Sequence, residues 1–455
     1  MNLNESMFRE YDIRGIVKLD FPGPVVESLG KAFGTYISRQ KGNVISVSGD
    51  IRESSPELKT NFINGILSTG VNVIDTGMLP TPVNYYSMYH LNTDAAVQIT
   101  GSHNPKEFNG FKFSCMNESF YGKKIQLLKN MILNENFVKG EGKLKKQEVL
   151  NDYIQMLCSK IKLNKKLKVI IDSGNACACL TAPQTLKKLD VEVEELYCNV
   201  DSSFPNHHPD PTVDSNLNDI ISKIKEGDFD LGMAFDGDAD RIVVIDENGE
   251  IIRSDNLICL FLPETITSEN KKIIFDVKCS EALEKMIVRY GGEPLMWKTG
   301  HSLIKDKMKI ERAKFAGEMS GHIFFADDYY GYDDALYVGL RLLKILSNTN
   351  KTLSQLTSKI PKYYSTPEMR IDCKDDKEKF KIAEMAIQYF TDNYDCITID
   401  GVRIKFENGW GLVRSSNTQP VIVCRFEATS QNDLNQMKEM VLTKLSEFGE
   451  IKYDE

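Results

Sequence analysis

Apolar and polar positions recur in the same order three times along the first two thirds of the chain. Each copy has a β-branched run that ends in Asp, a short polar loop, an amphipathic helical stretch and a second β-branched run. This order predicts strand–helix–strand units, which build parallel sheets covered by helices. The copies run from Val44–Asp50 through Leu58–Leu67 to Val71–Ile74, from Lys168–Asp172 through Thr181–Leu189 to Val191–Leu196, and from Lys272–Asp276 through Glu281–Tyr290 to Pro294–Trp297.

The last part of the chain has a different pattern. A strand near Met369–Ile371 and a charged helix near Asp375–Tyr389 are followed by several β runs between Cys396 and Phe426 and by a helix over Leu434–Phe448. The predicted fold class is therefore α/β, with three similar mixed α/β domains and a smaller C-terminal α+β domain.

The length of 455 residues also predicts three or four domains, since single cores stop growing near ~250 residues. Polar or Pro-containing boundaries occur at Lys139–Gln147, after Glu247–Glu250 and near Pro361. We expect domains at residues 1–146, 147–250, 251–360 and 361–455.

Composition narrows the function mainly by exclusion. A net charge of -9 opposes broad attraction to nucleic acid, so we expect a small-molecule substrate. The chain has no run of about 18 apolar residues, and its first residues show no basic segment followed by an apolar run. We therefore expect a cytoplasmic protein without a membrane partner. The ten cysteines form no CxxC pair, which favours reduced, mostly buried thiols over zinc ligands or disulfides.

Ser102 lies in the loop Thr100–Pro105, directly after the apolar strand pattern Ala95–Ile99. Loops at the carboxyl ends of strands often bind ligands. A serine hydroxyl can accept and return a phosphoryl group, Gly101 lets the backbone approach a phosphate, and His103 can donate a hydrogen bond. Taken alone, such a turn is structural more often than catalytic.

Three aspartates, Asp236, Asp238 and Asp240, alternate in a loop between two apolar strand patterns, Leu231–Phe235 and Ile242–Ile245. Carboxylates without a nearby Cys or His favour magnesium or calcium over zinc. An EF-hand does not fit, because Arg241 stands at its glycine position and the flanks are strands. A solvated turn is the alternative, although repulsion among three carboxylates disfavours it.

Two further loops could bind a phosphorylated sugar. Gly317–His322 offers the Glu318 carboxylate, the Ser320 hydroxyl and the His322 imidazole between glycines, which together can hydrogen-bond sugar hydroxyls. Arg414–Pro420 combines a guanidinium with hydroxyl and amide groups, which suits a phosphate monoester.

With these four motifs in this order, the chain resembles the α-D-phosphohexomutases, and most closely their bacterial phosphomannomutase/phosphoglucomutase group, over essentially its whole length. Phe8–Gly15 and Phe204–Pro211 also match that group. Ala239 departs from it, because the family more often has glycine there. The resemblance implies four domains around a central active-site cleft, with a smaller, mobile last domain. His207 and His208 also match the group, but a Pro-rich connector explains them, so we leave them outside the predicted site.

The resemblance implies reversible phosphoryl transfer between C1 and C6 of a mannose or glucose phosphate, through a phosphoserine and a hexose 1,6-bisphosphate. Ser102 would carry the phosphoryl group and bind Mg²⁺ with Asp236, Asp238 and Asp240, and glucose 1,6-bisphosphate would act as activator. The implied catalytic residues are Ser102, Arg14, His103, Lys112, Arg241 and His301. The implied substrate-binding residues are Tyr11, Lys278, Glu318, Ser320, His322, Arg414, Ser416, Asn417 and Thr418.

Three other functions compete with this hypothesis. A phosphoglucosamine mutase more typically has Gln where Met319 stands, so Met319 favours glucose and mannose phosphates. A metal-dependent phosphohydrolase with a serine nucleophile would need more histidine or a second metal cluster. A non-enzymatic sugar-phosphate-binding protein would not need Ser102 or the three aspartates. The sequence leaves the preferred hexose open, and also whether the chain is a monomer or a dimer.

Overall fold

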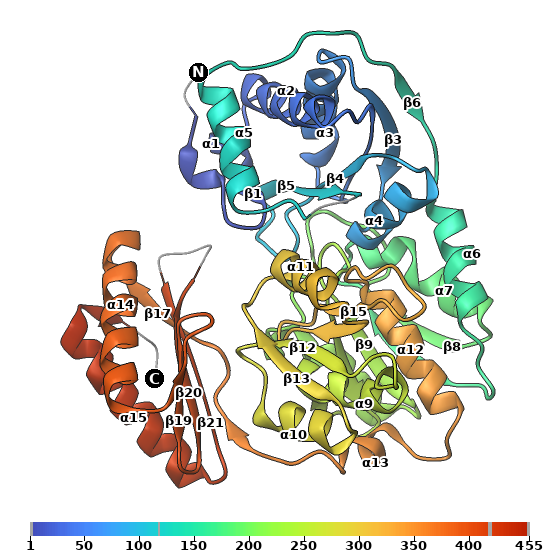
Figure 1. Ribbon diagram of the computed structural model, residues 1–455. Helices are drawn as coiled ribbons and strands as arrows, with labels where there is room; N and C mark the ends of the chain where they lie inside the picture. Colours follow the sequence, from blue (N-terminus) through green and yellow to red (C-terminus); the bar gives the residue numbers. More distant parts are fainter. Residues whose placement is uncertain (1–2, 117–118, 417–420, 453–455) are drawn as a thin grey trace. The chain divides into compact units, whose positions relative to one another are not determined.

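The computed structural model describes residues 3–116, 119–416 and 421–452 (Figure 1). The chain divides into two compact units. Unit 1 comprises Met1–Phe261 and Ser320–Thr357, and unit 2 comprises Leu262–Met319 and Ser358–Glu455. The helix α9 (Ser254–Thr265) contains the first boundary.

Unit 1 begins with a six-stranded mixed sheet in the order β1-β5-β4-β2-β3-β6. Strand β2 pairs in parallel with both β3 and β4, whereas β5 runs antiparallel to β4 and β1. Its elements are β1 (Ile13–Ile16), α1 (Val17–Asp20), α2 (Gly23–Arg39), β2 (Val44–Gly49), α3 (Ser55–Leu67), β3 (Asn72–Met78), α4 (Thr81–His90), β4 (Ala95–Ile99), β5 (Phe108–Cys115), α5 (Lys123–Leu133) and β6 (Leu144–Lys146).

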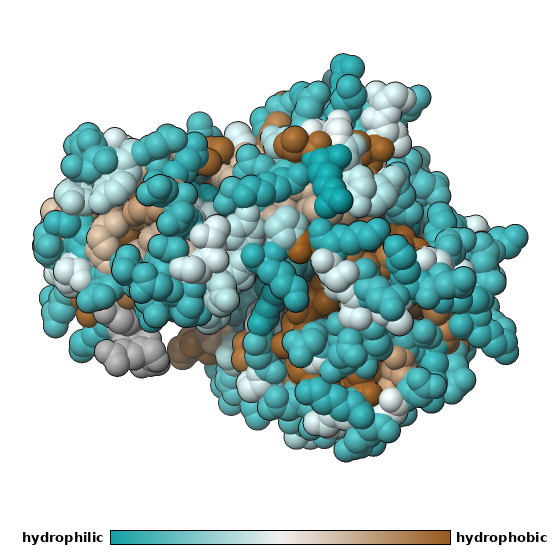
Figure 2. Space-filling view, turned by 90° about the horizontal axis from the view of Figure 1, so that it is seen from below, coloured by the Kyte–Doolittle hydropathy of each residue, from teal (hydrophilic) through white to brown (hydrophobic). Residues whose placement is uncertain are grey.

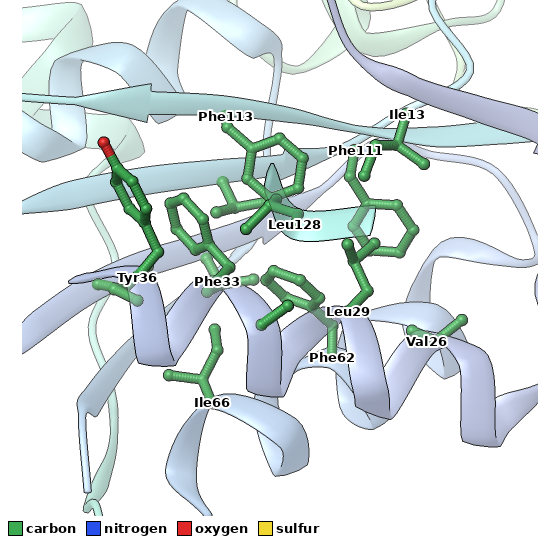
Figure 3. Packing of buried hydrophobic residues seen from close by; sticks show 14 of the residues in the cluster. Ile13, Val26, Leu29, Phe33, Tyr36, Phe62, Ile66, Phe111, Phe113 and Leu128 are labelled. Carbon is green, nitrogen blue, oxygen red and sulfur yellow. The ribbon is translucent and has the colours of Figure 1, made fainter. Parts of the chain in front are cut away.

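Helices α2 and α3 cover one face of this sheet, and α4 lies on the other (Figure 1). Helix α2 turns Val26, Leu29 and Phe33 toward the sheet at helical spacing, where they pack with Phe62 and Phe111 (Figure 3). The two helices approach closely through glycines, because a Cβ on Gly30 would lie 2.1 Å from a backbone oxygen of α3. This core fixes the strands whose carboxyl ends carry the candidate chemistry.

A second sheet of unit 1 has the order β11-β10-β9-β7-β8. Strand β7 pairs in parallel with β8 and β9, and β10 runs antiparallel to β9. The remaining elements of unit 1 are α6 (Leu150–Lys160), β7 (Lys168–Asp172), α7 (Ala182–Lys188), β8 (Glu192–Leu196), α8 (Asn218–Glu226), β9 (Leu231–Phe235), β10 (Ile242–Asp246), β11 (Ile251–Ile252), β15 (Ile323–Phe325), α12 (Ala335–Ser347) and α13 (Leu353–Thr357).

In unit 2, β12 pairs in parallel with β13 and β14. A separate antiparallel sheet has the order β18-β19-β20-β21-β17-β22, with β16 paired to β21 and with α14 and α15 packed together against it (Figure 1). The elements are β12 (Lys272–Asp276), α10 (Glu281–Arg289), β13 (Glu293–Trp297), α11 (His301–Glu311), β14 (Phe315–Gly317), β16 (Tyr364–Ser365), β17 (Met369–Cys373), α14 (Asp376–Asn393), β18 (Cys396–Ile397), β19 (Val402–Phe406), β20 (Gly409–Ser415), β21 (Val421–Ala428), α15 (Gln431–Phe448) and β22 (Ile451–Lys452).

The predicted fold class is confirmed. Each predicted strand–helix–strand unit is present with its strands parallel, in β2–α3–β3, β7–α7–β8 and β12–α10–β13. The last part forms the predicted α+β arrangement. None of the ten cysteines, which all lie in the described residues, forms a disulfide; five are buried and five are half-buried.

The face that Figure 2 shows is mainly hydrophilic, with apolar residues scattered over it. Among the described residues, no helix combines the length and the apolar character that a bilayer crossing requires.

Candidate active site

Ser102 lies in a tight loop after β4, as the sequence predicts. Its backbone is left-handed, with φ of 50°, and its N–H donates to the side chain of Thr100. The preceding N–H, of Gly101, donates to the Asp50 carboxylate at the end of β2. Ser102 is only 1 % exposed, so a buried hydroxyl is held at the carboxyl end of a parallel strand.

The buried Arg52 guanidinium stabilises this loop through hydrogen bonds to backbone carbonyl oxygens. It donates to the carbonyl oxygens of Ser102 at 2.9 Å and Asn104 at 2.6 Å, and also to two further carbonyls at Pro105 and Phe108. An ion pair of 3.2 Å with Asp50 offsets its charge. Gly101 is required here, because a Cβ would lie 2.4 Å from the guanidinium carbon of Arg52.

The three aspartates of the predicted metal loop come together between β9 and β10. Asp236, Asp238 and Asp240 are fully buried, and one carboxylate oxygen from each lies within 4.8 Å of the others. Oδ1 of Asp236 accepts hydrogen bonds from two backbone N–H groups of its own loop, and Thr81 donates to Asp238. Strands flank the loop on both sides, which agrees with the rejection of an EF-hand.

Lys112 on β5 partly neutralises this acidic cluster. Its ammonium lies 2.7 Å from Asp238 and 2.6 Å from Asp240. Burial lowers the pKa of Lys112, but these two carboxylates outweigh burial and raise it above its ordinary value. Burial and the charges of Asp240 and Asp238 raise the pKa of Asp236 well above its usual range. Three closely spaced, buried carboxyl groups thus lie beside the Lys112 ammonium.

The donor set fits a hard divalent cation. Among the described residues, no group donates a hydrogen bond to Oδ1 of Asp238 or to Oδ1 of Asp240, although both oxygens are buried. A buried carboxylate oxygen without a donor is costly unless a cation satisfies it. The ligands are all oxygens, which magnesium and calcium prefer.

The serine loop and the aspartate loop contact each other directly. The Ser102 hydroxyl lies 3.3 Å from Oδ2 of Asp236 and 3.2 Å from Nδ1 of His103. A Cβ on Gly237 would lie 2.2 Å from the Ser102 carbonyl oxygen, so the close approach requires glycine. Burial, and then the charge of Arg241, lower the pKa of His103 well below its ordinary value. His103 is therefore a neutral imidazole beside the hydroxyl.

Two other predicted residues lie on the opening segment of unit 1. Arg14 on β1 pairs with Asp12 at 2.5 Å, and its charge contributes to the low pKa of His103. Tyr11 is half-buried just before this strand. Arg14 thus belongs electrostatically to the cluster around Ser102.

Arg241 and His322 form a contact at the edge of the aspartate loop. Nε of Arg241 donates to Nε2 of His322 at 3.0 Å, and it lies 3.9 Å from Asp236. His322 follows Ser320 in the motif Gly317–His322, along which the chain passes from unit 2 into unit 1. The predicted sugar-reading motif therefore contributes residues to both units.

Unit 2 holds the remaining predicted residues that the structure describes. Glu318 is buried, and its carboxylate accepts a hydrogen bond of 2.6 Å from the backbone N–H of Gly300. Gly300 directly precedes His301, the first residue of α11. The ammonium of Lys278 lies 3.0 Å from Glu368 and 3.9 Å from Asp276. Acidic and basic side chains therefore converge beyond the carboxyl end of β12.

Arg414, at the end of β20, belongs to the same group of charges. Its Nε lies 3.0 Å from Asp400, and its charge helps to lower the pKa of Glu368, after that of Lys278. Ser416 is buried, and its carbonyl oxygen accepts from Lys379. Asn417 and Thr418, also predicted for this loop, lie outside the described residues.

Sequence reasoning missed three residues that shape the site. Arg52 and Thr81 contact the serine and aspartate loops from positions with no recognisable motif. The third, His208, was left outside the predicted site, yet its Nε2 contacts the carbonyl oxygen of His103. Its place in the sequence signature Phe204–Pro211 was the one available signal.

Comparisons with known proteins identify the family. Four domain profiles described as phosphoglucomutase/phosphomannomutase match: α/β/α domain I at residues 5–139, α/β/α domain II at 151–249, α/β/α domain III at 253–364 and the C-terminal domain at 368–444. The phosphomannomutase/phosphoglucomutase of Pseudomonas putida is 44% identical to this chain, and the aligned region covers 97% of this chain and 96% of the relative.

Two further matches agree with this assignment. The phosphoglucomutase of Neisseria meningitidis serogroup A is 38% identical over 96% of both chains. A crystal structure of a phosphoglucomutase/phosphomannomutase family protein from Burkholderia thailandensis is 39% identical, with a TM-score of 0.92, covering 99% of this chain and 100% of that one. The chain therefore belongs to the phosphoglucomutase/phosphomannomutase family and is a phosphohexomutase of this type.

Proposed function

We propose that the enzyme moves a phosphoryl group reversibly between C1 and C6 of glucose or mannose phosphate, with Ser102 as the carrier. The observation that carries the proposal is the buried Ser102 hydroxyl, 3.3 Å from Asp236 and beside two further aspartates and the neutral His103. Such a hydroxyl can accept a phosphoryl group, and burial protects the phosphoserine from water.

Asp236, Asp238 and Asp240, together with an oxygen on Ser102, would hold Mg²⁺. The ion would neutralise charge on the transferring phosphoryl group. The two buried carboxylate oxygens without a hydrogen-bond donor among the described residues support this assignment. Lys112 and Arg241 add fixed positive charge beside the same aspartates, close to where charge develops during transfer.

The catalytic cycle makes a hexose 1,6-bisphosphate from either monophosphate. Phospho-Ser102 gives its phosphoryl group to the free sugar hydroxyl, the bisphosphate turns within the site, and its other phosphate returns to Ser102. Arg14, Lys112 and His301 are the candidate acid and base groups for the hydroxyl proton. Because the bisphosphate is also the species that restores phospho-Ser102 from the free serine, glucose 1,6-bisphosphate should act as activator.

Further recognition groups would hold the rest of the sugar. Glu318 and Ser320 would hydrogen-bond sugar hydroxyls that lie in similar places in both orientations of the sugar. Lys278 and Tyr11 would also bind the substrate. Arg414 and Ser416, with Asn417 and Thr418, would bind the phosphate that is not being transferred, because guanidinium and hydroxyl donors suit a phosphate dianion. We propose the division into residues 1–146, 147–250, 251–360 and 361–455, which the four matched profiles support.

The test compares the unmodified enzyme with Ser102→Ala on glucose 1-phosphate, mannose 1-phosphate and glucosamine 1-phosphate, with Mg²⁺ and glucose 1,6-bisphosphate. The proposal expects conversion of the first two substrates to 6-phosphates and loss of turnover in the variant. Full activity of Ser102→Ala would refute the carrier role. Release of inorganic phosphate without isomerisation would instead indicate a phosphohydrolase.

A further inference from the structure

Thr81, the first residue of α4, contacts the aspartate loop at two points. Its hydroxyl donates to Oδ2 of Asp238 at 2.5 Å, and its backbone N–H donates to the carbonyl oxygen of Asp238 at 2.9 Å. Thr81 is fully buried, so bulk water does not compete for these hydrogen bonds. The carboxylate and the backbone of one proposed metal ligand are therefore both bound to the same residue.

The hydrogen bonds on Asp238 determine which of its oxygens is left for a cation. Lys112 and Thr81 both donate to Oδ2, at 2.7 Å and 2.5 Å. Oδ1 is buried, and within the described parts of the chain no residue donates a hydrogen bond to it. Because the two oxygens of a carboxylate are rigidly connected, donors that fix Oδ2 also fix the direction of Oδ1. Oδ1 is thus the oxygen that Asp238 can offer to a hard divalent cation.

Buried side-chain hydrogen bonds fix the start of α4 against the first sheet of unit 1. Asn84 of α4 donates to the hydroxyl of Ser48 in β2, which in turn donates to Gln98 in β4. The amide of Gln98 donates to the carbonyl oxygen of Leu79, two residues before Thr81. All three side chains are fully buried, and hydrogen-bond networks of this kind rigidify the elements that they join. The same strand, β4, leads into the serine loop.

We infer that Thr81 is a positioning residue for the metal site: its hydroxyl holds the Asp238 carboxylate with Oδ1 toward the cation, and α4 ties this ligand to the sheet that carries Ser102. Residues that hydrogen-bond a metal ligand commonly orient it in this way. The inference rests on the proposed metal site, but it is tested by metal binding without substrate, so it does not depend on the reaction catalysed. Because the backbone N–H contact does not involve the side chain, removing the hydroxyl alone should leave the loop in place.

The first test measures the dissociation constant (Kd) of Mn²⁺ for the full-length protein by isothermal titration calorimetry, without sugar phosphate. Thr81→Val removes the hydroxyl and keeps the β-branched shape, so its Kd should rise about tenfold to a hundredfold, as is usual when a residue that orients a metal ligand is lost. Thr81→Ser keeps the hydroxyl, so its Kd should stay close to the unmodified value. An unchanged Kd in a folded Thr81→Val protein, or equal losses in both variants, would overturn the inference. An unmodified protein that binds no Mn²⁺ would overturn the proposed metal site together with it.

The second test asks whether Thr81 acts through Asp238. In an Asp238→Asn background, Thr81→Val should change the Kd for Mn²⁺ little, because the ligand that Thr81 orients is already altered. In an Asp240→Asn background, Thr81→Val should still raise the Kd about tenfold or more. Equal factors in the two backgrounds would contradict the inference, because Thr81 would then act on the site independently of Asp238.

The matched control is Thr69→Val, which removes another buried hydroxyl that donates one hydrogen bond. The Thr69 hydroxyl donates to the carbonyl oxygen of Ile66 at 2.6 Å, just after α3 and before β3, at the end of the first sheet opposite the serine loop. The Kd of this variant for Mn²⁺ should equal the unmodified value. Urea unfolding of every variant separates loss of folding from loss of positioning. If Thr69→Val raises the Kd as much as Thr81→Val does, the specific role of Thr81 is excluded.

Discussion

At the scale of single residues, the candidate site depends on buried charges that have specific partners. The three aspartates are balanced in part by Lys112, and the loop of Ser102 is held by one guanidinium. Arg52 is 2 % exposed, yet it makes contacts to the carbonyls of four residues and an ion pair with Asp50. A lysine could not span these acceptors, because it has a single point of charge instead of a planar fork.

Replacing Arg52 by Met should therefore affect both stability and the serine loop. Breaking a buried ion pair leaves Asp50 without its partner, so the free energy of unfolding should fall by about 3–5 kcal/mol, as measured by urea unfolding. Arg39→Met is the matched control, since Arg39 makes an exposed contact with Asn136. An Arg52→Met protein with the unmodified unfolding midpoint would contradict this role for Arg52.

At the scale of elements, the chemistry lies where buried strands end. Ser102 follows β4, Asp50 follows β2 and Asp236 follows β9, so each sheet presents its functional loops at the carboxyl ends of its strands. The connector Phe204–Pro211 is anchored at two such strand ends. Nε2 of His207 lies 2.9 Å from Asp172 at the end of β7, and Nε2 of His208 contacts the carbonyl oxygen of His103 in the loop after β4.

The contact between His207 and Asp172 should make stability depend on pH. Burial lowers the pKa of His207, but the hydrogen bond and charge of Asp172 outweigh it, so the folded-state pKa is raised. The stabilisation is then fully present below the unfolded-state value of ~6.5 and is lost as pH rises through the folded-state value.

Urea unfolding at about pH 5.5 and about pH 9 tests this sign. The stability advantage of the unmodified protein over His207→Gln should be larger at the lower pH. In an Asp172→Asn background the same substitution should show no such dependence on pH. A larger advantage at the higher pH would mean that the pKa is lowered in the folded state.

The elements and the motif loops were predictable from the sequence, whereas their supports were not. Strand–helix–strand periodicity and the Ser102 and Asp236–Asp240 motifs are local patterns, each visible within a short window. Arg52, Thr81 and His208 contact partners that are 50 or more residues away, and no spacing along the chain marks such contacts. Their roles depend on strand order and register, which only the folded chain reveals.

At the scale of the whole molecule, the proposed roles divide between the two units. The residues proposed to transfer the phosphoryl group, Ser102 and the three aspartates, belong to unit 1, whereas Lys278, Glu318 and Arg414 belong to unit 2. The motif Gly317–His322 connects these roles along the chain, because it contains the boundary between the units. Metal binding and substrate affinity should therefore respond to different substitutions.

Arg414→Met should raise KM for glucose 1-phosphate tenfold or more, since hydrogen bonds to charged groups contribute about 1.5–3 kcal/mol. Its affinity for Mn²⁺, used as a probe of the aspartate cluster, should equal that of the unmodified enzyme. Lys405→Met is the control, because Lys405 pairs with Asp395 at the surface. An unchanged KM would remove Arg414 from substrate recognition.

The central claim, that Ser102 stores the phosphoryl group, is tested most directly by labelling the protein. Enzyme incubated with Mg²⁺ and glucose 1,6-bisphosphate carrying ³²P should take up label that peptide mass spectrometry locates on Ser102. Added glucose 1-phosphate should then remove that label as bisphosphate, and Ser102→Ala should take up none. Label on another residue, or equal labelling of Ser102→Ala, would contradict the account.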